Sequence, residues 1–135
     1  MRFMIIVKAT QDSEAGVMPP QELFDVMGAY HEELAKAGVL LDASGLHPSG
    51  KGWRINWKNG SKTITDGPFT EAKELIAGYT IIQTKTEEEA REWVRRFPNP
   101  ALTDGEIEVR RLFELEDFEG VDLGKFREIG IGNGQ

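Results

Sequence analysis

The sequence predicts an α+β fold in which one antiparallel sheet carries two helices on a single face. The first observation is the order of segments along the chain: strand, helix, two or three strands, helix, strand. The second is that the two helical segments repeat apolar residues at helical spacing. The third is Asn59-Gly60 between two short apolar runs, the strongest short signal for a β-hairpin. Together they indicate a ferredoxin-like sandwich with an inserted β-hairpin.

Composition limits the classes of function. A chain of 135 residues fits one compact domain, and it has no apolar run near the roughly 20 residues that a spanning helix needs. The net charge of −7 disfavours a nucleic-acid partner, because phosphate binding requires a basic surface. The absence of cysteine excludes disulfides, thiolate ligands and a cysteine nucleophile, and suits a reducing compartment. We expect a cytoplasmic protein with no nucleic-acid and no membrane partner.

The first strand, residues 2–9, interleaves two apolar series, so we expect both of its faces to be buried and the strand to be central. Lys8 ends the second apolar series of this strand and could bind an anion at the mouth of a pocket. The favoured alternative is a lysine that extends from the strand end to solvent.

The first helix is predicted to begin near Pro19-Pro20 and to run to about residue 37, with Gly38 as its C-terminal cap. Its apolar stripe faces the sheet and consists of Leu23, Met27, Tyr30 and Leu34. His31 lies at the border of this stripe. An imidazole exchanges protons near neutral pH and could act as acid or base. The favoured alternative is a solvated histidine.

Residues 39–46 predict a second strand, and the loop after it carries His47. Loops at strand ends often carry chemistry, although polar loops also hold histidines without a role, so both interpretations stay open for His47. In the hairpin that follows, apolar and polar residues alternate from Trp53 to Trp57, which predicts a half-buried strand paired with residues 61–65.

The C-terminal half predicts a strand at 78–84 and a second helix. That helix begins with a capping box at Thr86 and ends before Pro98. A last strand at 106–113 completes a domain that we assign to residues 1–119. Residues 120–135 show no periodicity, and we expect a tail that is mobile or covered by a partner.

With both helices on one face, the other face of the sheet stays apolar and needs a cover. Two sheets packed face to face in a homodimer would provide it.

The stretch TDGPFTEAKELIAGY, residues 65–79, together with AGVLL at 37–41 and GLHP at 45–48, resembles the YCII-related family, in the branch named for its DGPF motif. The resemblance covers residues 1 to about 119. It implies a dimeric α+β barrel with a cleft between the sheet, the first helix and the motif loops. It also implies that relatives include lyases acting on chlorinated aromatic breakdown products, although most members have no assigned activity.

The resemblance further implies a catalytic His-Asp pair in the broader family. Its histidine aligns near Met27, where this chain has none, and His31 lies one turn away. His47 is therefore the better-matched candidate within the branch.

The motif offers candidate side chains for chemistry. Asp66 could be a general base or could hold His47 in one tautomer, so Asp66, His47 and His31 are the candidate catalytic residues. The candidate substrate-binding residues are Lys8, Glu71, Lys73 and Glu74. The alternative is that Asp66 caps a turn, Gly67 to Phe69 shape the loop, and Glu71 and Lys73 belong to a solvated face.

The sequence has no compact metal-ligand spacing and no phosphate-binding, dinucleotide or nucleophilic-serine motif, so we expect no cofactor and no metal. The remaining hypothesis is a cofactor-free lyase or isomerase that transfers a proton on a small polar or aromatic compound. The alternative is a non-catalytic dimer that binds a small molecule or has a regulatory role.

Overall fold

The computed structural model describes residues 1–132, apart from the side chain of Lys73. The elements in chain order are β1 (Arg2–Lys8), α1 (Gln11–Glu14), α2 (Gln21–Lys36), β2 (Leu40–Gly45), η1 (Ser49–Lys51), β3 (Trp53–Lys58), β4 (Ser61–Asp66), η2 (Ala72–Glu74), β5 (Ile76–Gln83), α3 (Glu87–Arg95), β6 (Ile107–Arg111), η3 (Leu115–Asp117) and α4 (Gly124–Ile129), where η marks a short 3-10 turn.

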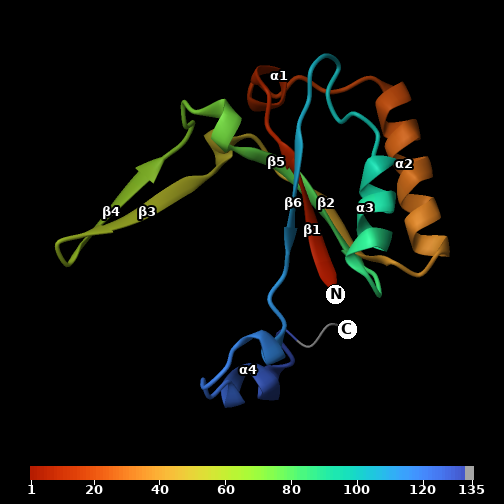
Figure 1. The fold of residues 1–135 in the computed structure, drawn as a ribbon. Helices are drawn as coiled ribbons and strands as arrows, with labels where there is room; N and C mark the ends of the chain where they lie inside the picture. The colour runs from red at the N-terminus through yellow and green to blue at the C-terminus, as the bar shows by residue number, and fades with distance from the viewer. Residues whose placement is uncertain (133–135) are drawn as a thin grey trace.

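The body is an antiparallel sheet of strand order β2-β5-β1-β6, and α2 and α3 lie side by side on one of its faces (Figure 1). Strands β3 and β4 form a separate two-stranded sheet. The mixed α+β prediction is therefore confirmed. Among residues 1–132, no helix has the length and apolar character needed to cross a membrane.

The core lies between the sheet and the two helices. Its buried side chains come from β1, β5, α2 and α3, and they are Phe3, Ile5, Tyr30, Leu34, Ile82 and Ala90. On β1 only the side chains that face the helices are buried, whereas Met4 and Ile6 on the opposite face are half-buried. The prediction that both faces of this strand are buried is therefore wrong for a single chain, because nothing in the described residues packs over the second face as a helix layer.

Both helix predictions are confirmed in position. Gly38, two residues after α2, has a φ of +75°, a conformation that glycine adopts without the penalty of a Cβ. At the start of α3, the Thr86 hydroxyl accepts a hydrogen bond from the Glu89 backbone N–H at 3.1 Å. The reciprocal bond differs from the predicted capping box, because the Glu89 carboxylate accepts from the Lys85 backbone N–H instead.

Tyr30 joins the two helices. Its hydroxyl donates to the Trp93 carbonyl oxygen at 2.6 Å, and its burial raises its pKa to about 12. An unfolded tyrosine ionises near pH 10, so the folded state binds the proton more tightly. The stability from this difference is fully present below about pH 10 and is lost as the pH rises from 10 to 12.

We expect Tyr30→Phe to remove this alkaline loss of stability and to cost about 1 kcal/mol at neutral pH, because the Trp93 carbonyl loses its donor. Urea unfolding between pH 8 and pH 11.5 measures both effects. Tyr79→Phe, at the other tyrosine of the chain, is the matched control and keeps the alkaline loss. An unchanged alkaline loss in Tyr30→Phe would show that other groups cause it.

Residues 53–66, which we call the arm, form the predicted hairpin. Asn59 (φ 52°) and Gly60 (φ 79°) make its turn, as the dipeptide predicts. The arm extends away from the body, on the side of the sheet opposite the helices (Figure 1). All of its residues are exposed, so the predicted half-burial of Trp53 to Trp57 is wrong for a single chain.

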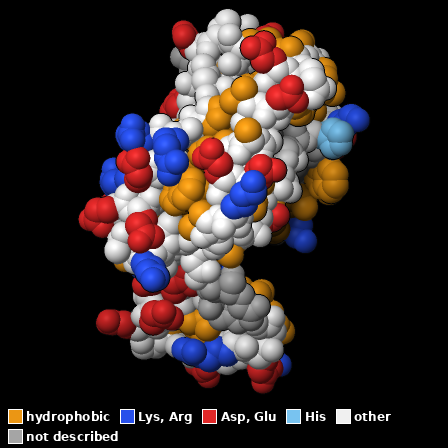
Figure 2. Space-filling view, turned by 90° about the vertical axis from the view of Figure 1, so that its right-hand side faces the viewer, with side chains coloured by type: hydrophobic (Ala, Val, Ile, Leu, Met, Phe, Trp, Pro, Cys, Tyr) orange, Lys and Arg blue, Asp and Glu red, His pale blue; other side chains and the backbone are white. Residues whose placement is uncertain are grey.

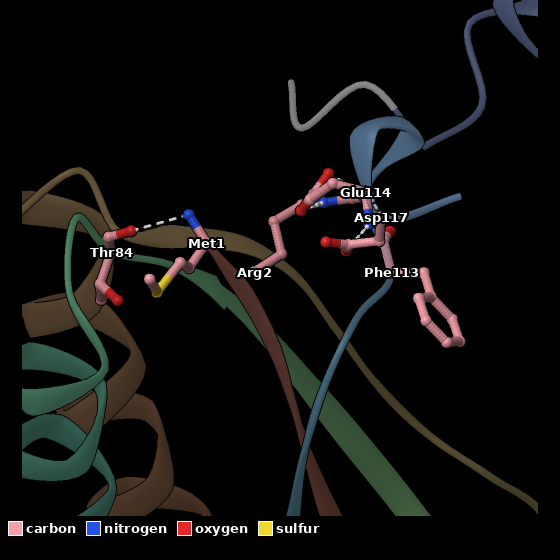
Figure 3. A network of polar contacts seen from close by, with 6 residues as sticks. All are labelled: Met1, Arg2, Thr84, Phe113, Glu114 and Asp117. Atoms are coloured by element: carbon pink, nitrogen blue, oxygen red, sulfur yellow. Dashed lines mark hydrogen bonds and ion pairs between the residues drawn. The ribbon is translucent and has the colours of Figure 1, made fainter. Parts of the chain in front are cut away.

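The C-terminal segment continues from β6 into a small lobe beside the body (Figures 1 and 2). Part of the predicted tail is helical, because α4 lies within it; residues 133–135 are outside the described part. Arg2 holds the start of the lobe through two bonds to the Glu114 carboxylate, at 2.9 and 3.1 Å (Figure 3). The helix face of the body carries interspersed acidic and basic side chains (Figure 2).

Candidate functional site

The most informative cavity is an open groove of about 450 Å³ between α2 and the β2-β5 side of the sheet. Its lining is mostly apolar and aromatic, with small residues on the strands. The lining residues are Val7, Phe24, Met27, Gly28, His31, Ala43, Ser44, Gly45, Ala77, Gly78, Tyr79, Thr80 and Phe97. An apolar cleft with a few polar groups is the usual form of a small-molecule site.

His31 is held in this groove by two hydrogen bonds. Its Nδ1 lies 2.8 Å from the carbonyl oxygen of Met27, and its Nε2 lies 2.8 Å from the Thr80 hydroxyl. A carbonyl oxygen only accepts, so Nδ1 carries the hydrogen. In the neutral ring, Nε2 then accepts from the Thr80 hydroxyl, and its lone pair is the basic position of the imidazole.

The position of His31 corrects the interpretation that the sequence favoured. A solvated helix histidine was expected, but the ring is half-buried and turned toward the sheet. Its edge packs against the aromatic rings of Tyr30 and Phe97, with ring centres 5.6 and 6.1 Å apart. Met27 lines the same groove one helical turn earlier.

Glycine at position 78 brings β2 close to β5 beneath the groove. A Cβ at Gly78 would lie 2.8 Å from the Ser44 carbonyl oxygen, which is closer than real Cβ atoms approach backbone. Glycine at position 78 therefore allows the close approach of β2 and β5 in the lining of the groove.

The DGPF loop is built into the scaffold. Gly67 donates its backbone N–H to the Gly52 carbonyl at 2.9 Å, and a Cβ at this position would collide with the Ser49 carbonyl oxygen. The Phe69 backbone N–H donates to the Ser49 hydroxyl at 3.0 Å, and the Arg54 guanidinium lies 3.7 Å from the centre of the Phe69 ring. These contacts support the structural interpretation of Gly67 and Phe69.

Glu14 is a residue that sequence reasoning missed. Its carboxylate accepts from the backbone N–H of Ser49 at 2.9 Å and also from the Ser49 hydroxyl. The structure places Glu14 at the end of α1, a short helix that begins with reciprocal hydrogen bonds between Thr10 and Ser13. Nothing in the sequence indicated its distant partner.

The structure does not bring the other candidates to His31. Asp66 is exposed at the end of β4, and His47 is exposed on the loop after β2. Neither lines the groove. Glu71, just before η2, and Glu74, its last residue, are exposed and are also outside the lining, while the Lys73 side chain is outside the described part.

Lys8 forms an ion pair at the end of β1. Its Nζ lies 3.2 Å from Glu108, and the hydrogen bonds from Lys8 and Arg110 lower the pKa of the Glu108 carboxyl. This partner favours the interpretation of Lys8 as a residue at a strand end. Within residues 1–132, no three histidine, aspartate or glutamate side chains gather closely enough to hold a metal ion.

The geometry is that of a small α+β domain with an apolar groove beside one helix. The chain belongs to the YCII-related domain family, which matches residues 1–116. It is 29% identical over 86 residues to the uncharacterized protein R00369 of Rhizobium meliloti (strain 1021), covering 64% of this chain and 69% of that protein.

Among solved structures, the chain is similar to the 5-chloro-2-hydroxyhydroquinone dehydrochlorinase TftG of Burkholderia phenoliruptrix AC1100, in complex with 2,5-dihydroxybenzoquinone. The TM-score is 0.48 and the identity is 15%, over 87% of this chain and 98% of that chain.

Proposed function

We propose that the protein binds a small polar or aromatic compound in the groove beside α2 and transfers a proton on it without a cofactor, as a lyase or isomerase. The observation that carries the proposal is the pair of hydrogen bonds that fixes the His31 ring. Because Met27 holds the Nδ1 hydrogen, Nε2 is the atom that would remove a proton from the ligand.

Thr80 has a defined part in this proposal. Thr80 is almost fully buried, and its hydroxyl lies 2.8 Å from the Nε2 of His31. A ligand that approaches Nε2 would take over this position, and the hydroxyl could then donate to an oxygen of the ligand.

The second candidate is a binding protein without catalysis. The groove lining contains no aspartate or glutamate, so no carboxylate of the lining supports the imidazole as in a His-Asp pair. That observation favours recognition over chemistry. In this case His31 and Thr80 would serve as hydrogen-bonding anchors for a ligand.

We also propose that the chain belongs to the DGPF branch of its family and forms a homodimer of the α+β barrel type. The motif at Asp66 to Phe69 supports the branch. The strand order, with both helices on one face, supports a ferredoxin-like body whose open face packs against a second copy. A cytoplasmic location stays a prediction from the absence of cysteine.

A ligand-stabilisation screen with small carboxylates, lactones and aromatics tests the proposal. A compound at 100 times its dissociation constant should stabilise the fold by about 2.7 kcal/mol. NMR in D₂O then shows whether the bound compound exchanges a carbon-bound hydrogen. Exchange supports proton transfer, binding without exchange supports the second candidate, and binding that Met27→Trp leaves unchanged would place the ligand outside this groove.

A further inference from the structure

The arm separates its side chains into two faces. The residues that alternate on one face include Trp53, Ile55 and Trp57 of β3, and the register places Ile64 of β4 directly opposite Ile55. The charged residues Asp66 and Lys62 lie on the same face, opposite Trp53 and Trp57 at its two ends. The four apolar side chains are 66%, 40%, 68% and 66% exposed in the order Trp53, Ile55, Trp57 and Ile64. The other face of the arm is polar, with Arg54, Asn56 and Lys58 on β3.

This apolar face has no cover within the chain. Strands β3 and β4 pair only with each other among the described residues. The contact of Arg54 with the Phe69 ring holds the base of the arm from its polar face. A lone two-stranded hairpin is marginally stable in water, and a contiguous exposed apolar face of this kind marks an interaction site.

The direction of the arm indicates what covers it. The arm projects on the side of the sheet opposite the helices (Figure 1). The same side carries the open face of the sheet, where Met4, Ile6 and Ile81 are half-buried. A second copy that packs on the open face would therefore lie within reach of the arm.

The charge of the arm also favours a second copy of this chain as its partner. Arg54, Lys58 and Lys62 against the single carboxylate of Asp66 give the arm a formal charge of +2 within a chain of −7, so the rest of the chain carries −9. A basic arm is attracted to the acidic body of a second copy. That acidic body would be repelled by nucleic acid or by an anionic membrane.

The area that the arms can bury is a substantial part of the area that a stable dimer interface needs. Each indole ring can bury about 150 Å² or more, so the four arm tryptophans of a symmetric pair supply roughly 600 Å². A stable interface buries about 1,600 Å² in total. The open sheet faces would supply the remainder.

We propose that the arm clasps a second copy of this chain and buries Trp53 and Trp57 against it. The inference rests on the proposed homodimer and adds a specific element to it. The arm of each protomer would embrace its partner beyond the packed sheets, which makes the contact isologous.

Sedimentation equilibrium of the full chain tests the arm. We expect Trp53→Ala/Trp57→Ala to weaken the dimer at least 100-fold, because the central aromatic anchors are lost. Asn56→Ala/Thr63→Ala changes the polar face of the same two strands and should leave the dissociation constant within about threefold. In a Trp93→Phe background, which leaves only the arm tryptophans, emission should shift to the red as dilution dissociates the dimer.

The outcomes of these experiments distinguish the proposal of a homodimer from the proposal that the arm clasps the second copy. Ile6→Glu places a charge on the open sheet face and should disrupt the homodimer. A dimer that Ile6→Glu breaks but the double tryptophan variant leaves intact, with solvent-exposed arm emission throughout, overturns the arm proposal alone. A wild-type chain that is monomeric at millimolar concentration overturns both. Emission that shifts to the blue only with vesicles of anionic phospholipid would assign the arm to a membrane and overturn the clasp.

Discussion

His31→Gln should slow hydrogen exchange on a bound compound by about 10²- to 10⁴-fold, the range that a positioned general base contributes. Glutamine can still form hydrogen bonds near Met27 and Thr80, but its amide does not take up a proton at neutral pH. We therefore expect the dissociation constant of the compound to change by less than about tenfold. The measurement is NMR exchange in D₂O with the strongest-binding compound of the screen.

His47→Gln is the matched control, because His47 is the other histidine of the chain and is exposed on a loop outside the groove. It should leave both exchange and binding unchanged, as should Asp66→Asn. Equal loss of exchange in His47→Gln and Asp66→Asn, with full exchange in His31→Gln, would move the chemistry to the motif loops. Full exchange in all three variants would remove the imidazoles from the mechanism.

The local parts of the fold were predictable because their signals lie within a few residues. Asn59-Gly60 adopts the positive φ values of a tight hairpin turn, and Gly38 adopts the left-handed conformation of a helix cap. Side-chain periodicity likewise identified the helix stripe that buries Tyr30 and Leu34. Each of these features depends on the chain's own neighbouring residues.

The environment of His31 was not predictable in the same way. Its partner, Thr80, lies 49 residues away on β5, and helical periodicity does not say which strand residue a border position will face. The same applies to Glu14, whose partner Ser49 lies 35 residues away. Long-range hydrogen bonds follow from the packing of whole elements, which a single sequence does not encode as a local pattern.

The alternation in the arm was interpreted as half-burial, but the residues of both strands are exposed in the single chain. Alternation reports that one face needs an apolar neighbour, but it does not say whether that neighbour belongs to the same molecule. The same limit applies to β1, where Met4 and Ile6 are only half-buried. Both disagreements occur on the side where we place the second copy.

Gly67→Ala should destabilise the protein by about 1–3 kcal/mol, the usual cost of forcing an extra carbon into a packed site. The new Cβ would collide with the Ser49 carbonyl oxygen, and this neighbour is backbone that cannot rotate away. Moving it would also disturb the bonds from the Gly67 N–H to Gly52 and from the Phe69 N–H to Ser49. The free energy of unfolding in urea measures the change.

Gly50→Ala is the matched control in the facing loop, because a Cβ at Gly50 would have no atom within 4 Å. It should change the free energy of unfolding by less than about 0.5 kcal/mol. If Gly67→Ala is as stable as Gly50→Ala, the two loops are not packed as described. If it instead folds normally but loses ligand binding, the DGPF loop contributes to the site directly rather than as scaffold, and the groove beside His31 is not the whole of it.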